Sequence, residues 1–448
     1  MTTVGEELQG DTIDLLQHLI RNACVNEGTE SSGGEARNAA HLASYLEGSG
    51  VDIETFESAP GRSSVVARLE GSDPAALSLL YLAHTDVVPV NPDAWRRDPF
   101  GGELVDGEVW GRGAVDMLNL TAAMAVAFRH LAATGFRPRG TLIYAGVADE
   151  EALGTYGAGW LVDNAQDAVR ADYVITESGG IPIETPAGTR LPVMVAEKGC
   201  HWCKLTVHGT AGHASAPLRT DNALVTAAEV VRRLAAFQPP VVISDAWRRL
   251  VEGLALPEEL SRDLVDPERI GPLLEALPDL GFARQAHAST HTTISPTIAH
   301  GGTKTNVIPD SVELELDIRV LPGQTGDDII AMLDEILGDL APRVTVETVV
   351  DERASESPID TPLWDVLQTV SGRFHAGSQT IPILAVGATD ARFFRRIGAT
   401  AYGYGLFSKK MTFGDYLSMF HGADERVDVE SLGLSASLYE VTAREFLG

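Results

Sequence analysis

Short apolar runs alternate with longer helical patterns in the first part of the chain. Three runs, at 78–83, 141–148 and 172–176, are strand-length and rich in Leu, Ile, Val and Tyr. Between them, residues 34–48 place Ala and Leu side chains on one face of a predicted helix, and residues 118–133 are apolar on nearly every face. This alternation predicts an α/β sheet with helices on both faces.

The pattern changes near residue 197. From there to about residue 350 it indicates four mostly antiparallel strands and two helices, which is a compact α+β module. Its clearest strand is 311–320, where apolar and polar side chains alternate. The predicted strands are 200–208, 291–299, 311–320 and 343–350, and the predicted helices are 221–236 and 325–339.

Residues 238–290 interrupt this module with prolines, acidic residues and short helical patterns. We interpret them as an insertion whose fold the pattern does not specify. The α/β pattern then resumes, with an apolar run at 380–386. We therefore expect an α/β domain in two parts, residues 1–196 and 353–448, interrupted by a smaller domain at residues 197–352.

The length of 448 residues suits such a division, and the formal net charge of −29 limits the possible partners. A chain this acidic is repelled by phosphate backbones and anionic membrane surfaces, so we expect no nucleic-acid partner and no membrane association. No run approaches the ~20 apolar residues of a membrane span. The start of the sequence also lacks the basic and apolar regions of a signal peptide. These features predict a soluble, cytoplasmic protein.

Three cysteines are too few for a disulfide framework. Cys200 and Cys203 form a Cys-x-x-Cys pair, which is compatible with a redox pair or with half of a zinc site. Because no second pair lies at zinc-finger spacing, we interpret both as structural thiols.

Side chains suited to metal binding follow each of the three apolar runs. His84 and Asp86 follow the first run, Glu150 and Glu151 the second, and Glu177 the third. Ligands of open α/β sheets bind at the carboxyl ends of the strands, so we expect these side chains to meet at one edge.

Each of these residues also has a simpler interpretation. Asp116 precedes the helical segment 118–133 at the position of an N-cap, a lone His at a strand end is more often structural, and a Glu-Glu pair is usually a solvated turn. Convergence favours a metal site, because several carboxylates at one edge repel one another unless a cation neutralises them. Mixed His and carboxylate ligation suits zinc, with cobalt or manganese as substitutes. Asp86 is predicted to orient His84, since residues two apart on an extended segment point the same way.

In combination these motifs resemble a family of dinuclear zinc hydrolases. The family contains aminoacylase-1, bacterial glutamate carboxypeptidase, succinyl-diaminopimelate desuccinylase, acetylornithine deacetylase and carnosinase-type dipeptidases. The motifs that carry the resemblance are HTDVVP from His84, WGRGAVDM around Asp116, the Glu150–Glu151 pair, Glu177, and HGADE from His421. The resemblance covers nearly the whole chain. It implies a mixed-sheet catalytic domain interrupted by an inserted α+β lid and dimerisation domain.

The resemblance also implies a role for each predicted ligand. Asp116 would bridge two divalent metal ions. His84 and Glu177 would complete one metal site, and Glu151 and His421 would complete the other.

The catalytic groups are implied in the same way. Glu150 would be the general base, and Asp86 would support a metal ligand. His213, in the segment GTAGHASAP, would reach across a homodimer, formed through the inserted domain, to the active site of the partner.

Three further residues are implied to contact substrate. Asn306 in TKTNVIPD and Arg319 in DIRVLPG would bind a substrate carboxylate, and Gly387 in GATDARFF would make a backbone contact. Many relatives follow the bridging aspartate with Lys or Asp and then Gly, whereas this chain has Met117 and Leu118. The stretch 238–290 resembles the larger peptidase and aminoacylase members.

The sequence therefore predicts a metal-dependent hydrolase that cleaves the amide or peptide bond of a small substrate with a free carboxylate, such as a dipeptide or an N-acyl amino acid. A two-metal phosphoesterase is one alternative, which we disfavour because such an enzyme usually needs several basic groups to bind phosphate, and the quoted metal motifs contain a single one, Arg112. A non-catalytic metal-binding protein that binds a peptide or serves in assembly is another alternative. Such a relative would lack the base or a ligand, yet all six positions are filled.

Overall fold

The three apolar runs form the centre of the main sheet. In the computed structural model, which describes residues 4–29 and 31–448, they are β3 (Leu79–His84), β6 (Leu142–Val147) and β7 (Tyr173–Thr176). β3 pairs in parallel with both β6 and β7. Every side chain of β3 and β6 is buried, as expected for strands covered on both faces.

Further strands extend this sheet on both sides. They are β1 (Asp52–Ala59), β2 (Arg62–Leu69), β8 (Ile183–Thr185), β9 (Gly188–Glu197), β16 (Ser355–Glu356), β17 (Gln379–Ala385) and β18 (Thr400–Gly403). In the described part of the chain the ten strands run in the order β1-β2-β6-β3-β7-β18-β9-β16, and β8 and β17 also pair with β9. Parallel and antiparallel pairs both occur, so the predicted mixed sheet is confirmed.

Helices cover both faces of the main sheet. The first face carries α1 (Val4–Arg21), α2 (Ala36–Leu46), α3 (Leu118–Ala133), α12 (Pro362–Phe374) and α15 (Val429–Leu447), and the second carries α4 (Ala158–Asn164), α5 (Gln166–Val169) and α13 (Ala391–Arg396). Side chains of β3 alternate between the two apolar layers, with Tyr81 in the first and Leu82 in the second. The residues predicted to be helical at 118–133 are those of α3, which is buried on nearly every face between α1, α15 and the sheet.

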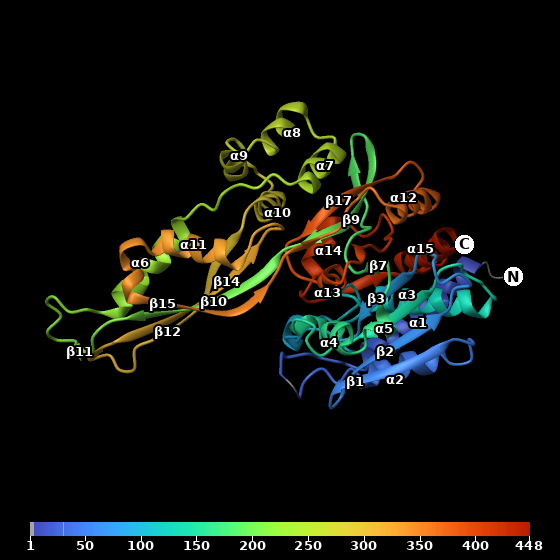
Figure 1. Cartoon of the computed structure of the whole chain (residues 1–448), viewed down its shortest axis with the longest axis horizontal. Helices are drawn as coiled ribbons and strands as arrows, with labels where there is room; N and C mark the ends of the chain where they lie inside the picture. Colours follow the sequence, from blue (N-terminus) through green and yellow to red (C-terminus); the bar gives the residue numbers. More distant parts are fainter. Residues whose placement is uncertain (1–3, 30) are drawn as a thin grey trace.

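A second, fully antiparallel sheet projects from the main sheet as an elongated arm (Figure 1). Its strand order is β12-β14-β10-β15, where the strands are β10 (Gly199–His208), β12 (Thr293–Gly301), β14 (Ser311–Val320) and β15 (Val344–Glu352). α6 (Ala223–Ala236) and α11 (Gly326–Leu337) pack on one face and bury an apolar core of their own. The predicted α+β module is therefore confirmed.

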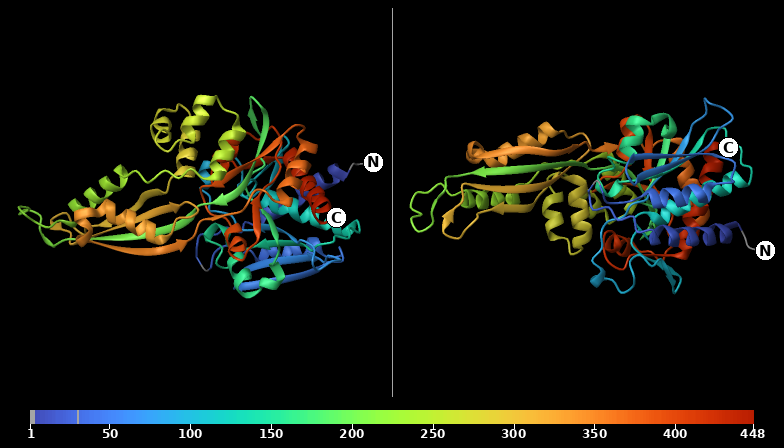
Figure 2. Two further views of the ribbon diagram at one scale, coloured as in Figure 1. Left: turned by 45° about the horizontal axis from the view of Figure 1, so that its top comes forward. Right: turned by 90° about the horizontal axis from the view of Figure 1, so that it is seen from below.

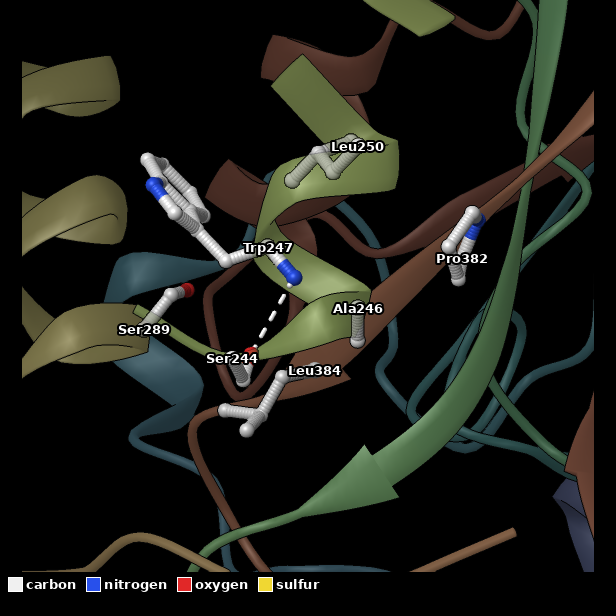
Figure 3. A pocket seen from close by; sticks show the side chains of 7 residues that line it. All are labelled: Ser244, Ala246, Trp247, Leu250, Ser289, Pro382 and Leu384. Carbon is white, nitrogen blue, oxygen red and sulfur yellow. Dashed lines mark hydrogen bonds between the residues drawn. The ribbon is translucent and has the colours of Figure 1, made fainter. Parts of the chain in front are cut away.

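Residues 238–290, for which the sequence specified no fold, form four short helices beside the junction between the arm and the main sheet (Figure 2). These are α7 (Asp245–Leu254), α8 (Glu258–Leu264), α9 (Ile270–Ala276) and α10 (Leu280–Thr290), which share a small apolar core. α7 packs on β17, where a cavity of about 10 Å³ is lined by Trp247, Leu250 and Leu384 among others (Figure 3). A cavity of this size holds at most one water molecule, so it is no substrate site.

The Cys-x-x-Cys pair lies on β10. Cys200 and Cys203 are both free and buried, and Cys203 belongs to the apolar core of the arm. Burial raises the pKa of the Cys200 thiol to about 11, so little thiolate exists at neutral pH. Among the described residues neither cysteine belongs to a group suited to metal binding.

No helix in the described ranges has both the length and the apolar character that crossing a membrane requires.

Candidate metal centre

The carboxyl ends of the central parallel strands carry predicted ligands to one edge of the main sheet. His84 is the last residue of β3, and Glu177 directly follows the last residue of β7. Glu150 and Glu151 lie in the turn after β6. Because β3 runs parallel to both of its neighbours, these ends lie side by side.

Among the residues that the structure describes, two groups of three side chains have the composition and spacing of a metal site. His84, Asp116 and Glu177 form the first ligand group, and Asp116, Glu151 and His421 form the second. In each group the ligand atoms lie within 4.8 Å of one another. Asp116 belongs to both, because its Oδ1 lies 3.3 Å from His84 Nε2 and its Oδ2 lies 3.1 Å from His421 Nε2.

Both ligand groups fit a divalent cation. A tetrahedral ion with bonds of about 2.0–2.2 Å separates its ligand atoms by about 3.3–3.6 Å. His421 Nε2 lies 3.2 Å from Glu151 Oε2, and His84 Nε2 lies 3.9 Å from Glu177 Oε2. The second oxygen of Glu151 is buried and accepts no hydrogen bond from any described residue. Two imidazoles among so many carboxylates leave a negative centre that a cation would neutralise.

The pKa shifts in the two ligand groups reflect this crowding. Burial and the charge of Glu177 raise the pKa of Glu150 well above its usual range. Burial and the charge of Asp116 raise the pKa of Glu151 to about 7. Hydrogen bonds to Asp116 and Glu151 raise the pKa of His421 to about 10. Burial would raise the pKa of Asp116 as well, but its contacts with the two imidazoles hold it below its usual range.

Asp116 does not cap a helix, so that simpler interpretation of it is wrong. α3 begins at Leu118, and its N-cap position is Met117, with no side-chain cap. The Asp116 carboxylate faces the two imidazoles instead, which leaves it no geometry for capping.

Asp86 fixes the turn that carries the two glutamates. Its Oδ1 accepts a hydrogen bond from the backbone N–H of Glu150 at 3.2 Å, and its Oδ2 accepts one from that of Glu151 at 3.1 Å. The imidazole of His84 is oriented mainly by the backbone carbonyl of Asp86, 3.0 Å from Nδ1, while the nearer carboxylate oxygen lies at 3.5 Å. Asp86 thus supports His84, as predicted from the spacing, and it also positions both glutamates.

A buried ion-pair network holds the other side of this turn. Arg62 donates to Glu35 Oε1 at 2.8 Å and to Asp149 Oδ1 at 2.6 Å, and all three side chains are at most 2% exposed. Asn26 donates to both Asp149 and Asp86. Asp149 has a left-handed backbone, with φ of 72°, directly before Glu150. Since breaking such a buried pair costs about 3–5 kcal/mol, the network holds the turn firmly in one conformation.

One predicted catalytic residue, His213, and one predicted substrate residue, Asn306, lie far from this centre within the same chain. His213 belongs to β11 (Gly212–His213), which pairs with β13 (Val307–Ile308) at the end of the arm away from the main sheet (Figure 1). Asn306 directly precedes β13, and its carbonyl accepts from the N–H of Ala214 at 3.1 Å. His213 and Asn306 are both exposed. The structure therefore brings them together with each other but not with the ligand groups.

Arg319 lies at the base of the arm, near the end of β14. Its guanidinium donates two hydrogen bonds to Asp317, at 2.9 and 3.0 Å, and Trp202 also donates to Asp317 at 3.1 Å. Gly387 lies in the exposed loop after β17, and a Cβ there would meet open space, so the fold itself does not require glycine. The predicted substrate contacts of both residues stay predictions.

Comparison with known sequences decides the family. Residues 80–445 match Peptidase family M20/M25/M40. The chain belongs to this family. It is therefore a metallopeptidase or amidohydrolase of the M20 type, which confirms the resemblance stated above and the predicted class of enzyme.

The M20 relatives are diverse in name. Human N-fatty-acyl-amino acid synthase/hydrolase PM20D1 is 29% identical over 372 residues, covering 81% of this chain and 73% of the relative. Aminoacylase-1A of Rattus norvegicus is 27% identical over 410 residues, covering 90% and 89%. Succinyl-diaminopimelate desuccinylase of Cereibacter sphaeroides is 27% identical over 376 residues, covering 82% of each.

Two solved structures share the fold across nearly their whole length. A metallo-carboxypeptidase of Sulfolobus solfataricus, Sso-CP2, superposes with a TM-score of 0.73 and 18% identity, covering 97% of this chain and 99% of that one. Human carnosine dipeptidase 1 gives a TM-score of 0.69 and 16% identity, covering 100% and 99%. These likenesses confirm the α/β fold with its projecting antiparallel sheet.

The residues that support the M20 ligands were not predicted from the sequence. Asn26, Arg62 and Asp149 carry no motif of their own, and only Asp149 adjoins a predicted functional residue. Asp390 was also missed: it lies in the GATDARFF segment and is 2% exposed, and burial raises the pKa of its carboxyl group to about 7. The only sequence feature that could have indicated these residues is the position of Asp149 and Asp390 within or beside recognised motifs.

Proposed function

We propose that this M20 enzyme holds two divalent cations, zinc with cobalt or manganese as substitutes, one at each ligand group. Asp116 would bridge them, His84 and Glu177 would complete the first site, and Glu151 and His421 would complete the second. The observation that carries the proposal is that Asp116 directs one carboxylate oxygen to each imidazole.

Glu150 is the proposed general base. Its Oε2 lies 4.0 Å from His84 Nε2, and Glu150 belongs to neither ligand group, so its carboxylate stays free to exchange a proton. Two bound cations would lower the pKa of a water molecule and polarise the carbonyl of the substrate. Glu150 accepts the proton of the attacking water and later delivers it to the departing amine nitrogen. The hydrogen bonds of Asp86 to the turn hold Glu150 in place for both transfers.

The proposed substrate is a small amide with a free carboxylate, either an N-acyl amino acid or a dipeptide. The names of the relatives support this class, since they describe an N-fatty-acyl-amino acid hydrolase, an aminoacylase and a desuccinylase. Arg319 would bind the carboxylate through its planar guanidinium, Asn306 would assist it, and Gly387 would offer a backbone contact. Asp317 and Trp202 hold the Arg319 guanidinium in a fixed orientation, which favours this role.

We further propose a homodimer formed through the inserted domain, residues 197–352. The catalytic domain would then comprise residues 1–196 and 353–448; the passage from β9 to β10 and the passage from β15 to β16 support these boundaries. His213 of each chain would serve the active site of the partner. Its exposed position at the end of the arm, away from its own ligand groups, supports action on a second copy.

His213 is proposed to donate a hydrogen bond to the oxyanion that develops on the substrate carbonyl in the partner's active site. Replacing His213 by Ala is therefore expected to lower kcat by about 10²–10³-fold. The dimer mass and the metal content should not change. A matched control is His208→Ala, an exposed histidine of the same domain, which should keep full activity. Mixing H213A with E150Q subunits tests the action between subunits: mixed dimers regain activity only if His213 serves the partner. Inactive mixed dimers would contradict the proposal.

The substrate class is tested by a direct screen. We expect the zinc-loaded protein to hydrolyse N-acyl amino acids or dipeptides and to leave the corresponding amino acid amides, which lack the carboxylate, nearly untouched. Release of free amine is measured for each compound, with phosphoesters as the negative set. Turnover of phosphoesters alone would overturn the proposed function.

A further inference from the structure

A second buried carboxylate, Glu425, binds the segment that leads into Asp116. Glu425 is fully buried, and its two oxygens accept four hydrogen bonds. Its Oε1 accepts from the backbone N–H groups of Val115 at 2.7 Å and Asp116 at 2.9 Å. Its Oε2 accepts from the N–H of Gly113 at 3.0 Å and from the guanidinium of Arg112 at 2.8 Å.

The same residue belongs to the segment that carries His421. Glu425 lies four positions after His421, and the guanidinium of Arg112 also donates to the carbonyl oxygen of His421 at 3.3 Å. The backbone extends the connection, because the N–H of Gly111 donates to the carbonyl of Glu425 at 2.9 Å. Two segments that are more than 300 residues apart in the sequence are thus joined by one ion pair and its hydrogen bonds.

Short strands continue this junction. β19 (Arg426–Asp428) pairs with β5 (Glu108–Trp110), so that Arg426 lies opposite Trp110. Glu425 directly precedes β19 and Arg112 lies two positions after β5, so both residues lie at the same end of this paired ladder. A carboxylate placed there by the backbone has little freedom to move away.

The two ligand groups differ in how their members are held. In the first group, His84 ends a central strand and Glu177 follows another, so the main sheet fixes them. In the second group, His421 lies in an exposed turn with φ of 58°, and its side chain is 51% exposed. His421 therefore depends on contacts of its turn, whereas His84 and Glu177 do not.

We propose that Glu425 is a positioning residue that sets the placement of Asp116 relative to His421 and thereby determines the metal affinity of the second ligand group. The proposal rests on the proposed function, because it takes both residues as ligands. Among the described residues, no hydrogen bond joins the Glu425 carboxylate to a ligand side chain of the second group. It acts through the backbone of Asp116 and, through Arg112, on the turn of His421.

The test is a metal titration of the stripped protein. In Glu425→Gln one oxygen becomes an amide NH₂ group, which cannot accept from the N–H groups that face it. Zn²⁺ affinity at the second ligand group is expected to fall by about 10–100-fold, the range for residues that orient metal ligands, while affinity at the first group is unchanged. With Co²⁺ as the probe, one of two absorption components should weaken. kcat should fall at low metal concentration and recover at saturating metal, with KM unchanged.

The matched control is Asp428→Asn, three positions further along. Asp428 is a buried carboxylate that binds Ser431 and Ser408 and caps α15, but it contacts neither ligand segment. The Asp428→Asn substitution should lower Tm without changing the Zn²⁺ affinity of the first or of the second ligand group. If Glu425→Gln and Asp428→Asn both weakened Zn²⁺ binding equally at the two ligand groups, the proposal would be overturned, since this would indicate a general loss of stability. Unchanged affinities in Glu425→Gln would overturn it as well.

A second variant, Arg112→Lys, tests the same proposal if Glu425→Gln does not fold. Arg112→Lys keeps a positive charge beside Glu425 but offers one ammonium nitrogen in place of the two guanidinium nitrogens that donate to Glu425 and to the His421 carbonyl, so it should weaken the second site alone and to a smaller extent. Failure of the proposed function gives a different result. If the wild type binds a single Zn²⁺, or if His421→Ala binds two as tightly as the wild type, the two-metal assignment itself is wrong.

Discussion

Replacing Glu150 by Gln is expected to lower kcat by about 10²–10⁴-fold while both cations stay bound, because an amide cannot accept the proton of the attacking water. The substitution preserves shape, so the backbone hydrogen bond from Glu150 to Asp86 should persist. KM should change little, since Glu150 is not expected to bind the substrate carboxylate. Steady-state kinetics and metal analysis of the same preparation check both statements.

The adjacent residue provides the control. Glu151→Gln removes a ligand of the second group, so it should lower metal content and should recover part of its activity at high metal concentration. The two neighbouring variants therefore separate loss of the base from loss of the cation. Full activity of E150Q, or loss of metal from it, would remove Glu150 from the proposed role.

Removing the cations with a chelator is expected to abolish turnover and to destabilise the protein by an amount that grows with pH. In the absence of cations the pKa values of Glu151 and Asp390 both lie at about 7, above their unfolded values of about 4.3 and 3.9. The stripped folded state thus binds more protons than the unfolded state in this range. The stability from these groups is fully present below about pH 4 and is lost as the pH rises to about 7.

His421 extends the effect to higher pH. Its pKa of about 10 lies above its unfolded value of about 6.5, so a further part of the stability is lost between these two values. Cations bind the deprotonated ligands, and their affinity therefore rises over the same range. Thermal unfolding of stripped and Zn²⁺-loaded protein from pH 5 to 9 should show a widening difference in Tm. A difference that narrows with pH would contradict the two ligand groups.

The sequence predicted those parts of the fold whose pattern is local. The strict alternation of 311–320 matches the bounds of β14, and the apolar segment 118–133 matches those of α3. The ligands that end or follow strands were recognisable for the same reason, because strand and ligand are adjacent in sequence. The family motifs then separated Glu150 from Glu151, which have nearly identical surroundings in sequence.

The remaining features depend on contacts between distant segments. The helices α7–α10 are short, and their apolar stripes become meaningful only when they share a core and α7 packs on β17. The role of Glu425 depends on the contact between the segments HGADE and WGRGAVDM, and this contact cannot be predicted from the periodicity of the sequence. Asp116 was a plausible cap until the structure placed it between two imidazoles.

The inserted arm also affects the order in which the molecule can fold. Gln9 of α1 donates a hydrogen bond to the carbonyl of Val429, the first residue of α15, across 420 positions of sequence. Closing so long a loop is slow, because conformational entropy is lost before the stabilising contacts can form. The arm closes far shorter loops, because its four strands lie between Gly199 and Glu352. During refolding we therefore expect the arm to mature first, with its exposed end already formed while the cation ligands are still apart.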